Sequence, residues 1–221
     1  MRQDVFELPI EGRPPARVHL ISGLATQSEM MRGEETEMLG LFAKGGWPGL
    51  SEDCMVILPG THSKHVRVKG RAIVGFRTFM TGELFDLLVA QSILKASMAP
   101  PAERAPLDLT ESREAFHEGI RQSRQPGLVA GLFQARIRTV LQHQPIATNH
   151  WFLSGLLIGG ELALLNHAKE ICPVMIAAPA TTSNAYRLAL ESLVENRELV
   201  FAPPEEVAEA SVRAHQLLLE R

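Results

Sequence analysis

Five consecutive residues, Gly60-Thr61-His62-Ser63-Lys64, bring a glycine, two hydroxyl groups and a cation to one point of the chain. They follow Pro59 and an apolar run at residues 55–58. A phosphate group is bound by backbone N–H groups that it can approach without a Cβ in the way, and a nearby positive charge stabilises it. The pattern therefore predicts a phosphate-binding turn. A polar turn that opens a hairpin is an equal alternative on spacing alone, because this is neither a Walker A loop nor a dinucleotide fingerprint.

A second group of reactive side chains stands earlier, at Arg32-Gly33-Glu34-Glu35. Adjacent carboxylates beside an arginine could supply a general base and a clamp for an anionic substrate. Acidic residues are also favoured in the first turn of any helix by the helix dipole. From the pattern alone this structural explanation is the stronger of the two, and both stay open.

Other patterns favour structural roles. Gly155, Gly159 and Ala163 recur every four residues and predict a helix face that packs closely on a neighbouring helix, with a hinge between lobes as an alternative. His62 and His65 lack a third ligand at zinc spacing, so no metal site is predicted. The pair Ser92 and Lys95 has the spacing of a serine–lysine hydrolase, but its companion motifs are missing, which argues against an unrelated hydrolase.

Strands that alternate with helices indicate an α/β protein. Thr81 is expected to cap a helix that carries Leu84, Leu87 and Leu88. Residues 1–15 show no clear period, residues 44–49 read as a loop, and residues 96–109, with three prolines, as a linker or lid-like loop. The expected strands are 18–21, 55–58, 65–68, 72–76, 173–177 and 198–201, and the further helices are 34–43, 111–124, 128–142, 150–168, 184–196 and 204–220.

The composition of the 221 residues excludes several classes of protein. A net charge of −3 gives no basic surface for nucleic acid. The longest apolar segment, residues 151–165, is too short to span a bilayer and contains Glu161. The first twenty residues contain charges and no apolar stretch, so no secretory signal is expected. Two cysteines, each inside an apolar run, fit buried thiols in a reducing compartment. We expect a cytoplasmic protein without a membrane or nucleic-acid partner.

Five motifs in a fixed order resemble a known family, that of 2-dehydro-3-deoxygalactonokinase, from about residue 8 to the end of the chain. Five ordered motifs are far more specific than any one of them. They are Met31-Arg32-Gly33-Glu34-Glu35-Thr36, Leu58-Pro59-Gly60-Thr61-His62-Ser63-Lys64, Thr78-Phe79-Met80-Thr81-Gly82-Glu83-Leu84, Leu132-Phe133-Gln134-Ala135-Arg136 and Leu153-Ser154-Gly155-Leu156-Leu157-Ile158-Gly159.

The resemblance implies an actin-like (ribonuclease H-like) two-lobed kinase fold. Residues 1–80 would form the remainder of an N-terminal lobe with the hairpin of the second phosphate loop, and residues 81–221 a helical and C-terminal lobe. It also implies transfer of the ATP γ-phosphate to the 6-hydroxyl of 2-dehydro-3-deoxy-D-galactonate with Mg²⁺. The implied partners are therefore ATP and a small sugar acid, and a homodimer is left open.

The resemblance also implies roles for individual residues. In sugar kinases of this fold the catalytic acid often precedes the second phosphate loop by a helix and a strand, and Glu34 and Glu35 stand in that relation to Gly60. We expect Glu34, with Glu35 as second choice, to be the base, and Arg32 and Gly33 to bind the sugar acid. Gly60, Thr61, His62, Ser63 and Lys64 match the second phosphate loop, and Ala177, Ala178 and Pro179 fall at the adenosine-binding turn.

Two departures from the family pattern carry expectations of their own. Members of the family begin with a strand and an Asp-Trp-Gly-Thr/Ser-Thr phosphate loop that this sequence does not contain, so we expect an N-terminally truncated first lobe. The chain would then be a non-catalytic remnant that still binds nucleotide or sugar acid, unless an in-frame loop is encoded upstream. Second, the adenosine turn usually has glycine where this chain has Ala177 or Ala178. Alanine would be strained by about 1 kcal/mol if the position requires positive φ.

Overall fold

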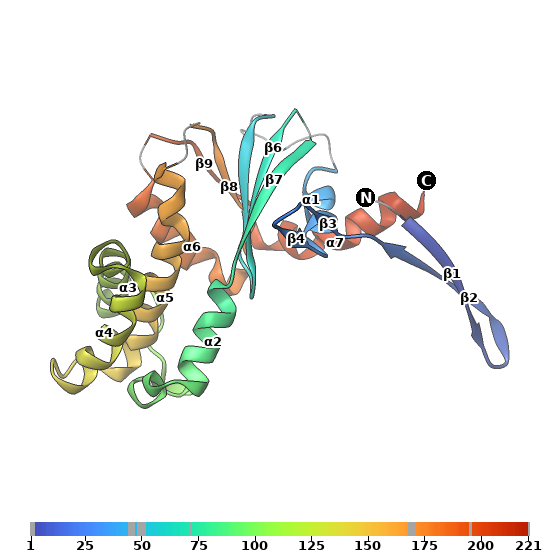
Figure 1. Cartoon of the computed structure of the whole chain (residues 1–221). Coiled ribbons are helices and arrows are strands. Elements are labelled where there is room, and N and C mark those ends of the chain that lie inside the picture. Colours follow the sequence, from blue (N-terminus) through green and yellow to red (C-terminus); the bar gives the residue numbers. More distant parts are fainter. Residues whose placement is uncertain are drawn as a thin grey trace. The chain divides into compact units, whose positions relative to one another are not determined.

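The computed structural model describes residues 3–43, 47, 52–70, 72–167, 171–194 and 196–220 (Figure 1). By its internal contacts the chain divides into two units. The first comprises residues 1–47 and 209–221, and the second comprises residues 48–208. The turn at Gly60 and the adenosine-turn residues at 177–179 belong to the second unit, whereas Arg32, Glu34 and Glu35 belong to the first.

A five-stranded mixed sheet forms the centre of the second unit, in the order β7-β6-β5-β8-β9. β5 is antiparallel to β6 and parallel to β8; β6 is antiparallel to β7, and β8 is parallel to β9. This is the ribonuclease H-like order that the resemblance implies, and the α/β fold class is confirmed. The strands are β5 Cys54–Leu58, β6 Ser63–Lys69, β7 Ala72–Phe79, β8 Val174–Ile176 and β9 Leu199–Phe201.

A helical segment lies between β7 and β8 in the sequence, and one further helix connects β8 to β9. The helices are α2 Thr81–Gln91, α3 Thr110–Gln122, α4 Leu128–Val140, α5 Ile146–Leu162 and α6 Ala180–Leu193. Shorter helical turns occur at Ile93–Ser97, Pro101–Glu103, Ser123–Gly127 and Ala163–His167. The expected helices and strands of this unit are thus present with shifted ends, and the segment 96–109 contains parts of two short turns.

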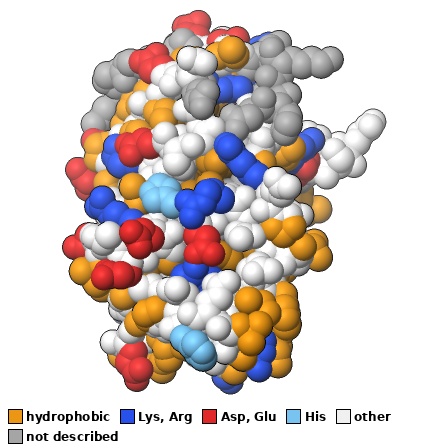
Figure 2. All heavy atoms as spheres, turned by 90° about the vertical axis from the view of Figure 1, so that its left-hand side faces the viewer, with side chains coloured by type: hydrophobic (Ala, Val, Ile, Leu, Met, Phe, Trp, Pro, Cys, Tyr) orange, Lys and Arg blue, Asp and Glu red, His pale blue; other side chains and the backbone are white. Residues whose placement is uncertain are grey.

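Two apolar clusters hold the second unit together. The first joins one face of the sheet, through Ile57 and Ile176, to Ile158 of α5 and Leu190 of α6. Figure 1 shows α6 alongside β8 and α5. The second cluster is formed by the helices themselves around Phe152. On the helical face drawn in Figure 2, acidic and basic side chains are interspersed.

The first unit contains a long hairpin, a two-residue pair of strands and α1. The hairpin is β1 Gln3–Ile10 with β2 Arg13–Ile21, the short pair is β3 Leu24–Ala25 with β4 Met30–Met31, and α1 is Glu34–Leu41. The last helix, α7 Pro204–Leu219, contributes its residues from Glu209 onward. Gly40 of α1 packs so closely on α7 that a Cβ there would lie 1.7 Å from the Ala210 carbonyl oxygen.

The expectation that residues 1–15 lack a regular period is wrong, because β1 and the start of β2 occupy them. Phe6, Leu8 and Ile10 alternate with polar residues and Pro9, which is the period of a strand. The prolines obscured this pattern. Within the described residues β1 and β2 pair only with each other, so one edge of each strand is unpaired. A proline, which has no N–H to donate, is tolerated at such an edge. The register of the pair shifts at Pro9. The predicted loop at 44–49 lies outside the described residues, except Trp47.

No helix in the described part of the chain is both long and apolar enough to cross a membrane.

The predicted small face of α5 packs on α3 at backbone distance. A Cβ on Gly155 would lie 2.0 Å from the Phe116 carbonyl oxygen, and one on Gly119 would lie 2.1 Å from the Phe152 carbonyl oxygen. A Cβ on Gly159 would lie 3.1 Å from the Ile120 Cα. The prediction of close helix packing is confirmed, and these glycines set how deeply the two helices approach.

Substituting Gly155→Ala should therefore force α3 and α5 apart and lower the free energy of unfolding by about 1–3 kcal/mol. Gly160→Ala on the same helix is the matched control, because its Cβ would meet only the Leu128 side chain, at 3.5 Å or more. That variant should be neutral or more stable by up to about 1 kcal/mol, the usual gain in a helix. Equal urea midpoints for the two variants would contradict the close-packing explanation.

Candidate functional site

The carboxyl ends of the parallel strands β5 and β8 bring the two predicted ligand-binding turns together. The Ala177 N–H donates a hydrogen bond to the Ile57 carbonyl, with 2.9 Å between nitrogen and oxygen. The chain leaves β5 into the turn at Gly60 and leaves β8 into Ala177, Ala178 and Pro179. Ligands of open α/β sheets bind outside the carboxyl ends of such strands. We call residues 60–64 the phosphate turn and residues 177–179 the adenosine turn. They begin 117 residues apart in the sequence (177 − 60), and they share one edge of the sheet.

A cavity of about 620 Å³ opens at this edge. Its wall includes Gly60 and Thr61 of the phosphate turn and Pro179 of the adenosine turn. The volume and the mixture of apolar walls with a few polar groups are typical of small-molecule sites. Its apolar side comes from α2 and α5, through Phe85, Trp151, Leu157 and Ile158.

The segment 96–109 closes one side of this cavity through Arg104 and Ala105. The Trp151 indole N–H donates to the Ala105 carbonyl at 2.8 Å, and the Ala105 N–H donates to the Ala147 carbonyl at 2.9 Å. The segment that was expected to be a linker or lid-like loop is thus hydrogen-bonded to α5.

His150 adds a neutral imidazole to the same wall. It is buried and lies beside the Trp151 ring, with 4.7 Å between ring centroids. Burial, and then the charge of Arg104, lowers its pKa to about 4, although the Ala147 backbone acts in the opposite direction. The ring is therefore uncharged at neutral pH, and its Nδ1 has no hydrogen-bond partner among the residues that the structure describes.

The phosphate turn is held by contacts from two sides. The Gly60 N–H donates to the Ser63 hydroxyl oxygen at 3.4 Å, and the Glu83 N–H donates to the Thr61 carbonyl at 3.0 Å. Gly82, at the start of α2, lies so close that a Cβ there would be 2.6 Å from the Gly60 carbonyl oxygen. Gly60, Thr61 and His62 are exposed, and no hydrogen bond to the Thr61 or His62 amide is found within the described residues.

The other two residues of the predicted loop are directed inward. Ser63 and Lys64 are buried, and the Lys64 ammonium donates to the His62 carbonyl at 2.8 Å. The exposed His62 instead pairs with Glu83, with 2.5 Å between Nε2 and Oε2. In this structure Ser63 and Lys64 stabilise the turn from within, while Gly60, Thr61 and His62 face solvent.

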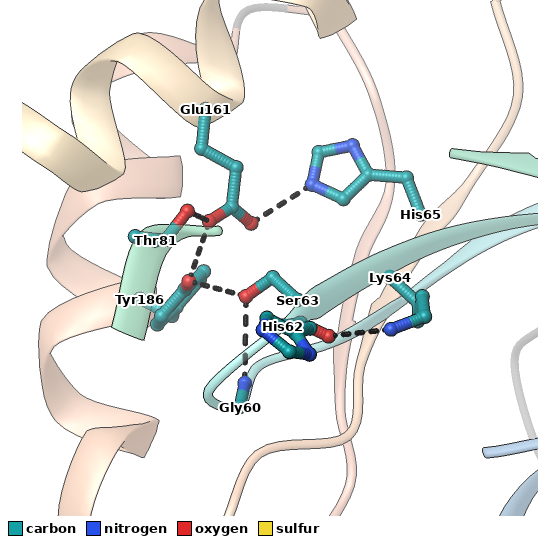
Figure 3. Close-up of polar contacts among 8 residues, drawn as sticks. All are labelled: Gly60, His62, Ser63, Lys64, His65, Thr81, Glu161 and Tyr186. Carbon is teal, nitrogen blue, oxygen red and sulfur yellow. Dashed lines mark hydrogen bonds and ion pairs between the residues drawn. The ribbon is translucent and has the colours of Figure 1, made fainter. Parts of the chain in front are cut away.

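Behind the turn, side chains from three elements contact the buried carboxylate of Glu161 (Figure 3). Glu161 of α5 accepts a hydrogen bond from the Tyr186 hydroxyl of α6 at 2.8 Å and another from the Thr81 hydroxyl. Its other oxygen lies 3.0 Å from His65 Nε2 on β6. The Tyr186 oxygen is also 3.0 Å from the Ser63 hydroxyl, which links the cluster to the phosphate turn.

Thr81 does not cap α2 as the sequence predicts. Met80 occupies the cap position, and no side chain caps the first N–H groups. Thr81 is the first residue of the helix, and its hydroxyl is used by Glu161 instead. Glu161, eighty residues away in the sequence, takes the Thr81 hydroxyl in place of the helix N–H groups, because a buried carboxylate is costly unless it is hydrogen-bonded.

The alanines of the adenosine turn are not strained. Among the described residues other than glycine, only His143 and Asn196 have positive φ. Ala177 and Ala178 therefore fit their backbone positions, and the expected penalty of about 1 kcal/mol does not arise. Both are fully buried, and α6 begins at Ala180, after Pro179 at its N-cap.

The predicted base and substrate residues lie in the first unit, around a tight turn. Gly33 has φ +113°. Its N–H donates to both carboxylate oxygens of Glu35, at 3.0 and 2.9 Å, and the Arg32 N–H donates to Glu34 at 3.0 Å. Glu35 is buried whereas Glu34 is half-exposed. Burial, and then the charge of Glu34, raises the pKa of Glu37 to about 7. These contacts show how the turn is built, and the catalytic role of Glu34 or Glu35 stays a prediction.

Several residues of the site were missed from the sequence. Glu161 had a signal, since it is the one charge in the apolar segment 151–165. Gly82 stood within the third motif but without an expected role, and Tyr186 had no signal that distinguishes it from an ordinary helix residue. Their importance comes from long-range contacts with the turn.

Known proteins match this chain over most of its length. The family model for 2-keto-3-deoxy-galactonokinase matches residues 5–212. A probable 2-dehydro-3-deoxygalactonokinase of Rhizobium meliloti (strain 1021) is 35% identical over 182 residues, 79% of this chain and 56% of the relative. The 2-dehydro-3-deoxygalactonokinase of Escherichia coli (strain K12) is 33% identical over 183 residues, 80% of this chain and 58% of the relative. The chain thus spans a little over half the length of these curated relatives.

A solved structure shares the fold. The crystal structure of a Sinorhizobium meliloti protein, assigned as a 2-dehydro-3-deoxygalactonokinase, superposes with a TM-score of 0.75 at 31% sequence identity. The match covers 97% of this chain and 69% of that one. Since the family model covers more than nine tenths of its residues, the chain belongs to the 2-keto-3-deoxy-galactonokinase family.

Proposed function

We propose that the chain forms the nucleotide-binding part of a kinase that transfers the γ-phosphate of ATP to the 6-hydroxyl of 2-dehydro-3-deoxy-D-galactonate. One observation carries the proposal: a single cavity is lined by both the phosphate turn and the adenosine turn. Family membership supports the sugar acid as the acceptor, since the matched relatives are named for it.

The cavity separates into an apolar side and a polar end, which suits a nucleotide. Phe85, Trp151 and Leu157 offer surface for a base and ribose. The polar part of the wall includes Gly60 and Thr61 of the phosphate turn, where the Thr61 amide suits phosphate oxygens and the absence of a Cβ on Gly60 leaves room for them. Phosphoryl transfer depends on positioning and electrostatics, and the hydrogen bonds that hold this turn suit such positioning.

Magnesium fits this site only as an ion carried by the phosphates. Among the described residues no three His, Cys, Asp or Glu side chains are grouped to hold a metal. Mg²⁺ keeps several waters and needs one or two carboxylates besides phosphate oxygens. Asp86, on the cavity wall, is the carboxylate that could reach it. The ion would supply charge neutralisation of the phosphates.

For the sugar acid, Glu34 of the first unit is the proposed base, with Glu35 as second choice, and Arg32 and Gly33 are proposed to bind the acid. The half-exposed carboxylate of Glu34 supports this ranking, because Glu35 is buried and accepts two hydrogen bonds from Gly33.

The nucleotide site can be tested by calorimetric titration of the purified chain with Mg·ATP, comparing Gly82→Ala with wild type. Wild type should bind one ATP. A Cβ on Gly82 would strike the Gly60 carbonyl and the Thr61 Cα and displace the turn, so ATP affinity should fall at least about tenfold. Gly75→Ala is the control, since its Cβ meets nothing within 4 Å. Equal affinity in all three proteins would place the phosphates elsewhere.

Turnover should be followed as ADP release from ATP with 2-dehydro-3-deoxygalactonate. If Glu34 is the base, Glu34→Gln should lower kcat about 10²–10⁴-fold at unchanged ATP affinity, while Glu35→Gln retains most of it. The reverse order would assign the base to Glu35, and near-normal turnover in both variants would rule out the assignment. ATP binding by the wild type without any turnover would favour the non-catalytic alternative.

A further inference from the structure

Tyr186 lines the cavity, and its hydroxyl contacts the Ser63 hydroxyl of the phosphate turn. We propose that Tyr186 is a positioning residue that fixes the Ser63 hydroxyl, and through it the Gly60–Ser63 turn, in the orientation that receives a nucleotide's phosphates. This inference rests on the proposed nucleotide site and adds a residue to it.

Figure 3 draws the hydrogen bonds of the cluster, and the Tyr186 proton decides their direction. Burial, and then the charge of Glu161, holds the pKa of Tyr186 well above its usual value, so the phenol keeps its proton. A tyrosine hydroxyl has one proton to donate, and Tyr186 donates it to Glu161 at 2.8 Å. At the 3.0 Å contact the Ser63 hydroxyl must therefore be the donor and Tyr186 the acceptor.

That direction determines what Ser63 can do. Its single proton points to Tyr186, away from the cavity, and its lone pairs are left to accept the Gly60 N–H at 3.4 Å. Ser63 is fully buried. It therefore acts on the turn by closing the loop onto Gly60, and the exposed amides of Thr61 and His62 are left for the ligand.

The other contacts of the turn do not depend on Tyr186. The Glu83 N–H still holds the Thr61 carbonyl, and Gly82 still packs on Gly60, when the phenol oxygen is removed. Loss of the hydroxyl should thus loosen the orientation of the turn without unfolding it. The apolar side of the cavity, formed by Phe85 and Trp151, should be unchanged.

The test compares Tyr186→Phe with wild type for binding of adenosine, ADP and ATP, by titration calorimetry. The ring is retained, so adenosine affinity should stay within about twofold. ADP and ATP affinity should fall about tenfold, equivalent to about 1.4 kcal/mol at 25 °C. Ser192→Ala is the matched control, because it removes a hydroxyl on the same helix that bonds the Ala189 carbonyl at 2.9 Å. It should change none of the three affinities.

Ser63→Ala provides a second route to the same result. It should reproduce the selective loss of phosphate-bearing ligands, and the double variant Ser63→Ala/Tyr186→Phe should be no weaker than either single variant, because both break one linkage. If Tyr186→Phe does not fold, the selectivity of Ser63→Ala decides the question. Equal losses for adenosine and ATP, unchanged ATP affinity, or additive effects would overturn the positioning role. A wild-type chain that binds neither ligand would instead overturn the proposed nucleotide site.

Discussion

A carboxylate buried in a protein must be surrounded by donors, since leaving it unpaired costs several kcal/mol. Glu161 is such a group, and three neighbouring elements supply side chains that hydrogen-bond to its carboxylate. α5 supplies the carboxylate, α2 begins at Thr81 beside it, α6 places Tyr186 against it, and β6 faces it with His65. Of these elements α2, α5 and α6 line the cavity, so the hydrogen bonds that Glu161 requires help to fix their relative positions.

The sheet and the hydrogen-bonded cluster around Glu161 contribute to the site in different ways. Parallel pairing of β5 with β8 brings the two turns to one edge, and the Ala177–Ile57 hydrogen bond sets their separation. Close packing of α3 on α5 through Gly119 and Gly155 then holds α5, and with it Glu161, at a defined depth. Backbone geometry thus places the cavity, while buried side chains determine which groups of the turn remain available to a ligand.

Local patterns in the sequence were enough for most of the fold. The apolar run of β5, the hairpin after it and the period of the helices are properties of neighbouring residues, and the structure contains them. The hairpin β1–β2 was missed because its prolines are compatible only with strands that have an unpaired edge, which depends on the surrounding sheet. For the same reason the sequence could place Gly60 at the site and could not place Tyr186. The contact of Tyr186 with Ser63 spans 123 residues, whereas the turn itself is a local motif.

Tyr186 is also the sole tyrosine in the 221 residues. Any signal that is specific to a phenol, whether in the near-ultraviolet or by Raman scattering, therefore arises from this one ring, next to the phosphate turn. Tyr186 is therefore a native spectroscopic probe of the phosphate turn and of the cavity wall beside it, and no label has to be introduced.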